Sequence, residues 1–312
     1  MKLQLFALTL LLVSCQKGTT NEHTPTPSPS GSSPVVTPVV TPSDTPVATP
    51  SNEPTPSEVI EDTTVTYQRV ERIINGYTVP THLVEVKLKS LSDLRSCFAT
   101  DENDEYGVDK YESLQSMVNK AKERDGLDIL AAVNGDYTFS SESRRGYSVK
   151  DGVIYRTSVK SKNSVDLVFG MDNTVSLMKE GSFKLDGNVG EKSKKYWQII
   201  SFGPVIAENS KIIIDESYEL PANTWVNNQR TAIGIIDWNH FFLLSTEANG
   251  RKHDGPLDSF RIYDLGVMLL EYGCHSVYNL DGGYSSGLAY NNEVVFKPTR
   301  NLSDMIYIVN EK

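Results

Sequence analysis

Cysteine is scarce in this 312-residue chain, which contains only Cys15, Cys97 and Cys274. No two of them form a C-x-x-C pair and none clusters with the five histidines, so the pattern of a zinc site is missing. We therefore expect no zinc site. Cys97 and Cys274 could pair in an exported protein, or they could be two separate buried thiols, and both alternatives stay open at this stage.

Positive charge is also in short supply. The chain has 30 Lys and Arg against 40 Asp and Glu, which gives a formal net charge of −10 at pH 7. No basic stripe interrupts this balance, and this argues against nucleic acid as a partner. Beyond the first fifteen residues no apolar run is long enough to cross a bilayer, so the sequence predicts no second membrane span.

Residues 1–15 have the pattern of an export signal. Lys2 supplies a positive charge, and the apolar run 3–13 is too short to span a bilayer. The run ends in Leu12-Val13-Ser14-Cys15, which resembles the lipobox of bacterial lipoproteins. That resemblance implies cleavage before Cys15, a lipid on Cys15, and an extracytoplasmic protein held on the outer side of the cell membrane. The alternative is a plain secretory signal, for which no better-placed small-x-small cleavage site is found.

Residues 16–62 are rich in Thr, Ser and Pro and have almost no bulky apolar side chains. Such a segment cannot bury enough surface to offset the entropy of ordering, so we predict a disordered linker. Its prolines keep it extended, which suits a stalk, although a tolerated linker of no particular length fits equally well. Residues 63–312 are long enough for a single catalytic domain with a sizeable core.

Hairpin signals recur through residues 63–312. Strand-like segments flank short turns such as Asn75-Gly76 and Asp151-Gly152, and we expect residues 199–207 to pair with residues 211–214. Only residues 110–124 and 257–272 have clear helical spacing, each with a glycine just beyond its end. Many hairpins with few helices predict an α+β fold of mixed or antiparallel sheets, because the βαβ alternation of a doubly wound fold is lacking.

Two buried strands end in clusters of small polar residues. Residues 276–280 lead into Asp281-Gly282-Gly283-Tyr284-Ser285-Ser286, and residues 129–133 lead into Asn134-Gly135-Asp136-Tyr137. A carboxylate at a strand end, beside bare backbone amides and two hydroxyls, can hold a polar or anionic group. The first cluster is equally compatible with an ordinary Asp-Gly-Gly turn.

Four short segments, taken in order, resemble the phosphodiester glycosidase family. They are Asn134-Gly135-Asp136-Tyr137, Ser201-Phe202-Gly203-Pro204, Arg230-Thr231-Ala232-Ile233-Gly234 and Asn279-Leu280-Asp281-Gly282-Gly283-Tyr284-Ser285-Ser286. The resemblance runs from about Thr81 to Ile308 and includes the closing Arg300-Asn301-Leu302-Ser303. Each segment is weak by itself, and their order and intervals make the resemblance specific.

The resemblance implies hydrolysis of a sugar-1-phosphodiester at the anomeric carbon, which releases a free sugar and a phosphate monoester. Glycoside cleavage normally uses two carboxylates, and we assign Asp281 as general base or nucleophile and Asp136 as the second carboxylate or a ligand of sugar hydroxyls. The guanidinium of Arg230 is our choice to hold the phosphate, with Arg300 as a weaker candidate. An arginine before a strand is otherwise more often a solvated surface residue.

The remaining expected contacts are to the substrate. We expect the amides of residues 282–286 and the hydroxyls of Ser285 and Ser286 to complete an anion cradle. Asn134 and Asn279 would bind the sugar or orient the carboxylates, unless each only caps its own turn. The expected substrate-binding residues are Asn134, Gly135, Gly203, Asn279, Gly282, Gly283, Tyr284, Ser285, Ser286 and Arg300. We read His240, His253 and His275 as incidental, and place His240 in a hairpin turn.

The chain departs from the usual family pattern at three places. Tyr284 stands where many relatives have a third glycine, and its ring could stack on a sugar or narrow the pocket. The first motif has Asp136 where others have glycine, and residues 248–251 lack the frequent Asp-Gly-Arg. We expect no cofactor. A divalent cation near Asp136 and Asp281 stays open as an alternative, although the sequence has no recognisable binding loop for one.

Two hypotheses from different classes follow. One is a membrane-anchored hydrolase acting on sugar-phosphate linkages of envelope or exopolysaccharide glycans. The other is a non-catalytic lipoprotein that keeps the fold and binds glycan or cell wall. The presence of both Asp281 and Arg230 favours the hydrolase. The sequence carries no signal for an oligomeric state.

Overall fold

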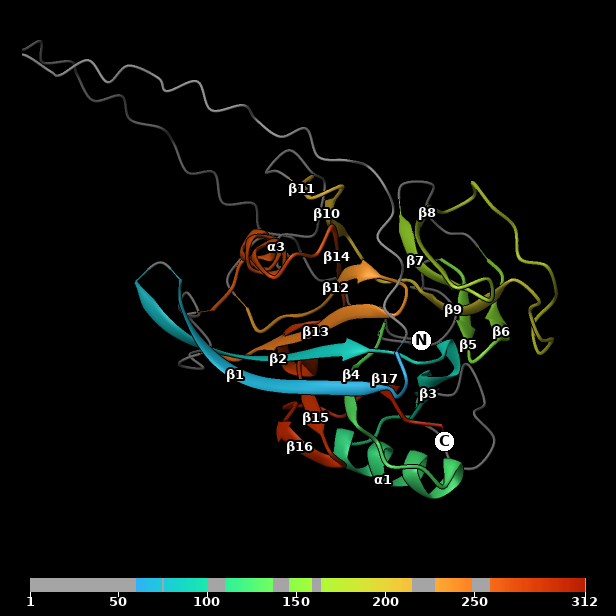
Figure 1. Ribbon diagram of the computed structural model, residues 1–312, viewed down its shortest axis with the longest axis horizontal. Coiled ribbons are helices and arrows are strands. Elements are labelled where there is room, and N and C mark those ends of the chain that lie inside the picture. The colour runs from blue at the N-terminus through green and yellow to red at the C-terminus, as the bar shows by residue number, and fades with distance from the viewer. Residues whose placement is uncertain are drawn as a thin grey trace, which may run out of the picture. The chain divides into compact units, whose positions relative to one another are not determined.

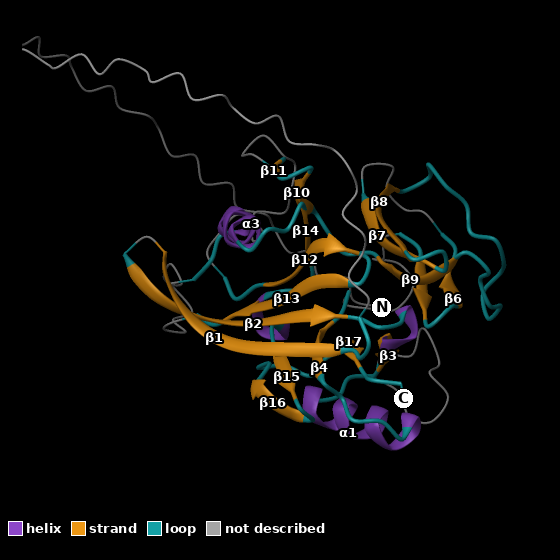
Figure 2. Cartoon of the chain, in the orientation of Figure 1, coloured by secondary structure: helices purple, strands orange, loops and turns teal. Residues whose placement is uncertain are grey.

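A computed structural model describes residues 60–74, 76–99, 110–136, 146–158, 164–214, 228–248 and 259–311. The predicted signal segment with Cys15, nearly all of the predicted linker, and His253 lie outside the described residues. Within these ranges the strands form three sheets, every pair of neighbouring strands is antiparallel, and two α-helices are present (Figures 1 and 2). This confirms the predicted α+β fold. No helix among the described residues is long and apolar enough to cross a membrane.

The first sheet begins with the long hairpin predicted around the turn at Gly76. In the order in which they pair, its seven described strands are β1 (Thr64–Ile74), β2 (Tyr77–Lys87), β13 (His240–Thr246), β12 (Thr231–Asp237), β14 (Ser276–Asn279), β10 (Val205–Glu208) and β11 (Lys211–Ile212). β1 alternates between more and less exposed side chains as expected of an edge strand, whereas β13 and β12 are buried along most of their length.

The other two described sheets have five strands each. One pairs in the order β16 (Glu293–Phe296), β15 (Leu288–Tyr290), β4 (Ala131–Asn134), β17 (Asp304–Ile308) and β3 (Leu94–Phe98). The other pairs in the order β6 (Val153–Arg156), β5 (Ser148–Lys150), β9 (Tyr196–Ile200), β7 (Val165–Gly170) and β8 (Thr174–Lys179). The β5–β6 turn is formed by Asp151 and Gly152, both at positive φ, as the Asp-Gly signal predicts.

The main hydrophobic core lies where the three sheets face one another. It joins Val84 of β2, Ile233 of β12, Val133 of β4, Ile306 of β17 and Phe169 of β7, all essentially inaccessible to solvent. A second core fills the space between the first sheet and helix α3 (Ile262–Glu271), and a third lies between the β4–β17 sheet and helix α1 (Leu114–Asp125). The two helices therefore cover separate sheets on the outside of the common core (Figure 2).

Both helices are shorter at their N-termini than predicted. Residues 110–113 are not helical, because Glu112 forms a bridge with Leu302 through two main-chain hydrogen bonds, and the extended Ser113 caps α1 instead. α3 begins only after the extended residue Arg261. The C-terminal stops were predicted correctly, since Gly126 is the left-handed cap of α1 and Gly273, at φ 85°, follows α3.

The expected strand at residues 199–207 is wrong as a single element. It is divided into β9 and β10, which belong to different sheets, with a cis peptide bond between Gly203 and Pro204 in the connection. Pro204 has no N–H to donate, so a continuous ladder is interrupted there. The second half pairs with β11 as predicted. The chain therefore passes between two sheets at Ser201–Pro204.

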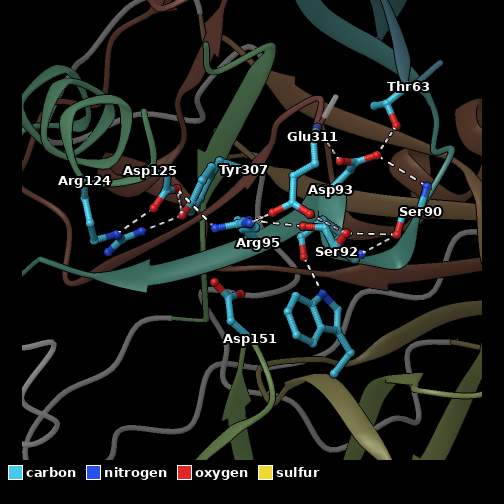
Figure 3. Close-up of polar contacts among 12 residues, drawn as sticks. Thr63, Ser90, Ser92, Asp93, Arg95, Arg124, Asp125, Asp151, Tyr307 and Glu311 are labelled. Carbon is cyan, nitrogen blue, oxygen red and sulfur yellow. Dashed lines mark hydrogen bonds and ion pairs between the residues drawn. The ribbon is translucent and has the colours of Figure 1, made fainter. Parts of the chain in front are cut away.

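Asp93 forms hydrogen bonds with residues near both ends of the described fold. Its buried carboxylate accepts from the Thr63 hydroxyl and from the main-chain N–H of Glu311 (2.8 Å). Arg95, two residues after Asp93, forms ion pairs with Glu311 and with Asp125 at the end of α1 (Figure 3). The two cysteines of the described region, Cys97 and Cys274, are separate buried thiols rather than a disulfide pair, which resolves the alternative left open by the sequence.

Candidate active site

Asn134 joins three strand ends into one site. At the end of β4 its side-chain amide donates to the main-chain carbonyl of Asp281, just after β14 (2.7 Å). Its Oδ1 accepts from the hydroxyl of Thr231, the first residue of β12 (2.8 Å), and from the N–H of Gly287 (3.3 Å). Asn134 therefore does more than cap its own turn, because it holds the expected catalytic loop against two other segments.

Asp281 is buried and paired with an arginine. Arg300 donates to the Asp281 carboxylate (Nη2–Oδ2, 2.6 Å) and to the Ser285 hydroxyl (Nε–Oγ, 2.5 Å). Burial raises the pKa of Asp281 above its usual value, and the Arg300 guanidinium opposes that rise. The arginine expected to be the weaker phosphate ligand is thus the direct partner of the expected base.

The loop after Asp281 is a short turn rather than an open row of amides. The N–H groups of Gly283, Ser285 and Ser286 donate to Gln229, Gly282 and Gly283, so they are not available to a ligand in this structure. The expected anion cradle is wrong for these three amides, because residues 283–285 wind into a 3-10 turn. The Ser286 hydroxyl, by contrast, is buried and has no hydrogen-bond partner among the described residues.

The glycines in this loop are required by space and by conformation. A Cβ on Gly282 would lie 3.0 Å from the carbonyl oxygen of Gln229, and Gly283 has φ +62°. Tyr284 is 56% exposed, while its main-chain carbonyl accepts from the N–H groups of Thr299 and Arg300. The Tyr284 ring therefore lies at the protein surface on a fixed backbone.

Arg230 is buried, unlike most arginines that precede a strand. Its main-chain N–H donates to the Thr246 hydroxyl (2.9 Å), and the side-chain Nε donates to the main-chain carbonyl of Phe260 (3.4 Å). Desolvation lowers the pKa of Arg230 to about 10, and Asp264 partly opposes this effect. The guanidinium still carries its charge at neutral pH, in surroundings that strengthen its attraction for an anion.

Asp136 lies against a second aspartate, Asp304, at the start of β17. The Asp136 N–H donates to Asp304 Oδ2 (3.1 Å), and Lys150 of β5 donates to the same oxygen (2.9 Å). A Cβ on Gly135 would lie 2.2 Å from Asp304 Oδ2, so only glycine allows this approach. Burial and the Asp304 charge raise the pKa of Asp136 to about 6. Burial acts to raise the pKa of Asp304 too, but Lys150 and the hydrogen bonds with Asp136 outweigh it and hold that pKa below its usual value.

The Ser201–Pro204 connection forms the next part of the site. The N–H of Ser201 donates to Asp136 Oδ2 (3.3 Å), and its hydroxyl donates to Asp166 of β7 (2.6 Å). The side chain of Asn279 donates to the carbonyl of Gly203 (2.8 Å), and its Oδ1 is buried without a hydrogen-bond partner among the described residues. Gly203 and Asn279, both expected to bind substrate, are therefore hydrogen-bonded to each other.

Sequence reasoning missed Asp304, Lys150 and Asp166. Asp304 directly follows the closing motif at residues 300–303, and its position at the start of the last strand is the sequence feature that could have identified it. Lys150 lies in a three-residue strand whose positions are all buried, and a lysine at such a position is uncommon unless it is paired. Asp166 is a charged residue inside an otherwise apolar strand, and burial together with Glu180 raises its pKa to about 7.

His240 and His275, which lie in the described part of the chain, do not belong to this cluster. His240 is the first residue of β13 rather than part of a turn, and its Nε2 lies 2.8 Å from Glu85. His275 contacts the hydroxyl of Ser276. Among the described residues no group of three or more His, Cys, Asp or Glu side chains is arranged to hold a metal ion.

Comparison with known protein families places this chain in one of them. The family model described as Phosphodiester glycosidase matches residues 128–309. This is more than half of the chain, and the matched region contains all four motifs. The chain therefore belongs to the phosphodiester glycosidase family. Searched by sequence, no curated protein matches it.

Solved structures share the fold at low sequence identity. The catalytic domain of zebrafish N-acetylglucosamine-1-phosphodiester alpha-N-acetylglucosaminidase, auto-inhibited by its pro-peptide, superposes with a TM-score of 0.59 and 18% identity over 83% of this chain and 84% of that chain. A hypothetical protein from Synechocystis superposes with a TM-score of 0.52 and 11% identity over 79% of this chain and 62% of that chain. At these identities the likeness shows the fold.

Proposed function

We propose that the protein hydrolyses a sugar-1-phosphodiester at the anomeric carbon and releases a free sugar and a phosphate monoester. One observation carries this proposal. Two buried carboxyl groups, Asp136 and Asp281, come from neighbouring strand ends whose main chains touch through the Asp281 N–H and the Gly135 carbonyl (3.4 Å). Paired carboxylates are what glycoside cleavage requires, and family membership supports their use on a phosphodiester.

Asp281 serves as the base or nucleophile in this proposal. Its pairing with Arg300 favours the ionised carboxylate, which either accepts a proton from the attacking water or attacks the anomeric carbon. Asp136 is the second carboxyl group on the other side of the Asn134 link. The unpartnered Oδ1 of Asn279 and the Ser286 hydroxyl provide hydrogen-bonding positions for sugar hydroxyls.

The leaving group is an anion, so the site must stabilise charge. A phosphate monoester has a second pKa near 6 and departs with little help from a strong acid. Arg230 is buried and positively charged, and a planar guanidinium can hold two phosphate oxygens at once. We assign it to the phosphate, where it favours the state in which negative charge develops on the leaving oxygens.

The cellular setting follows from the N-terminal segment. The lipobox-like sequence ending at Cys15 supports a lipid anchor on the outer face of the membrane, and residues 16–62 support a spacer between that anchor and the domain. A tethered enzyme of this kind would act on sugar-phosphate linkages of envelope or exopolysaccharide glycans.

The test is hydrolysis of synthetic sugar-1-phosphodiesters by the full chain in detergent. Substrates carrying p-nitrophenyl or a nucleoside on the phosphate would release the corresponding monoester, which is quantified by chromatography. We expect turnover by the wild type and its loss in Asp281→Asn, with urea unfolding of both as a control for folding. If neither protein turns over any of several sugars while a glycan still binds, the non-catalytic glycan-binding hypothesis replaces this proposal.

A further inference from the structure

Asp136 and Asp304 form a carboxyl pair whose two members are not equivalent. Oδ2 of Asp304 already accepts two hydrogen bonds, from Lys150 (2.9 Å) and from the Asp136 N–H (3.1 Å). Asp136 accepts a single long bond from Ser201 on its Oδ2 (3.3 Å), and its Oδ1 is buried with no donor among the described residues. Both carboxyl groups are buried, and the bond from the Asp136 N–H to Asp304 Oδ2 places the two residues directly against each other.

A hydrogen bond between two carboxyl groups requires a proton on one of them. Asp304 is the ionised member, because its oxygen is filled by donors and a buried ammonium lies beside it. The proton therefore belongs on Asp136, where an oxygen is left without a donor. This arrangement satisfies a buried polar atom that would otherwise be unpaired.

We propose that Asp136 and Asp304 share one proton held on Asp136. Both Asp304 and Lys150 are positioning residues in this proposal: the Asp304 carboxylate keeps Asp136 in its acid form, and Lys150 keeps Asp304 ionised so that the proton stays on Asp136. This inference rests on the proposed function. In the reaction the bond between the anomeric carbon and the phosphate oxygen breaks, and that oxygen leaves with the electron pair. Asp136 gives its proton to the departing phosphate, while water adds to the carbon and loses a proton to Asp281.

The charges around Asp136 support this assignment. Asp304 faces it from β17, Lys150 from β5 and Arg156 from β6, while Asp166 of β7 is reached through Ser201. The pKa of Asp136, about 6, is close to the second pKa of a phosphate monoester. A proton can therefore be exchanged between the two groups with little free-energy difference.

Infrared titration of the full chain tests the shared proton without relying on turnover. The carboxylic-acid C=O band is recorded against pH, and the contribution of Asp136 is taken from the difference between wild type and Asp136→Asn. We expect a band lost with a midpoint near pH 6. Asp304→Asn removes the neighbouring negative charge and should move this midpoint down by about one pH unit, whereas Lys150→Met should move it up by about as much.

Shifts of the Asp136 midpoint in opposite directions distinguish the proposal, because a merely structural role of Asp304 and Lys150 would not produce them. With an active substrate, the alkaline limb of kcat/KM should move in the same opposite directions. If Lys150→Met does not fold, the double variant Lys150→Met/Asp304→Asn replaces it, and its midpoint should lie above that of Asp304→Asn. The inference is overturned if no band is lost in Asp136→Asn, or if the charge variants leave the midpoint unchanged or move it in the same direction. Absence of turnover with intact band shifts would count against the proposed reaction and leave the proton assignment standing.

Discussion

The side-chain amide of Asn134 donates a 2.7 Å hydrogen bond to the main-chain carbonyl of Asp281, which lies 147 positions later in the sequence. This bond connects the two family motifs that contain the paired aspartates. The other side-chain atom, Oδ1, accepts from Thr231 and Gly287, so one buried residue fixes the relative position of three loops.

Replacing Asn134 by alanine should destabilise the fold and abolish activity together. The substitution leaves the Asp281 carbonyl and the Gly287 N–H without their buried partner, which should cost about 2 kcal/mol or more of unfolding free energy. Urea unfolding measures this loss. Thr231→Val is the matched control, since it removes one of the three Asn134 bonds together with the longer contact between the Thr231 and Ser245 hydroxyls, and it should cost about 1 kcal/mol. Equal losses in the two variants would contradict the bridging role.

Arg230→Ala should separate phosphate recognition from sugar recognition. Removing the buried guanidinium takes away the charge that we assign to the leaving phosphate, so kcat/KM for a phosphodiester should fall by about 100-fold or more. Binding of the bare sugar, measured by calorimetry, should change much less. Arg230→Lys keeps the charge without the planar fork and should recover part of the activity. Comparable losses of turnover and sugar binding would remove the role assigned to Arg230.

Asp166 should make the protein less stable as the pH rises. Its pKa of about 7 in the folded state is above its ordinary value of 3.8, so the folded state holds the proton more tightly than the unfolded chain does. Its stabilising contribution is therefore complete below about pH 4 and declines as the pH rises toward 7. We expect the difference in unfolding free energy, Asp166→Asn minus wild type, to increase by about 2 kcal/mol between pH 5 and pH 8.

Urea unfolding of wild type and Asp166→Asn at the two pH values checks this result. Asp136 and Asp151, whose pKa values are also raised to about 6 by burial, are present in both proteins, and their contributions cancel in the comparison. A difference between the two proteins that stays constant with pH would show that Asp166 is ionised throughout the range.

Tyr284→Ala should change substrate affinity more than folding. The ring is largely exposed and the backbone beside it is held by Thr299 and Arg300, so unfolding free energy should change by no more than about 0.5 kcal/mol. If the ring stacks on a sugar face, KM should rise several-fold while kcat stays within a factor of about two. Tyr284→Phe should retain the wild-type KM. An unchanged KM in Tyr284→Ala would place the substrate elsewhere.

Local sequence patterns predicted the hairpins well. The Asp151-Gly152 turn is encoded by residues that accept positive φ, and Gly126 ends α1 for the same reason. The division of residues 199–207 between two sheets was not predictable, because it depends on strands that are distant in the sequence. The start of α1 was missed for a similar reason, since Leu302 draws Glu112 into a bridge.

The candidate site was predictable only where the family motifs mark it. The motifs single out Asp136, Asp281 and Arg230 as candidates, and the structure brings the first two together at Asn134. Lys150 and Asp304 were not found, because a lysine in a short strand and an aspartate at a strand start are usually solvated. Their pairing appears only when β5 and β17, from different sheets, approach each other.

Because the Asp93 carboxylate binds both Thr63 and Glu311, the two ends of the described fold meet at one point. A short peptide joining residues 311 and 63 would therefore cross little distance. New ends could then be opened at the exposed turn of Asp172 and Asn173 between β7 and β8. Such a circular permutant would keep every strand pairing and allow the domain to be attached to a surface from a different side.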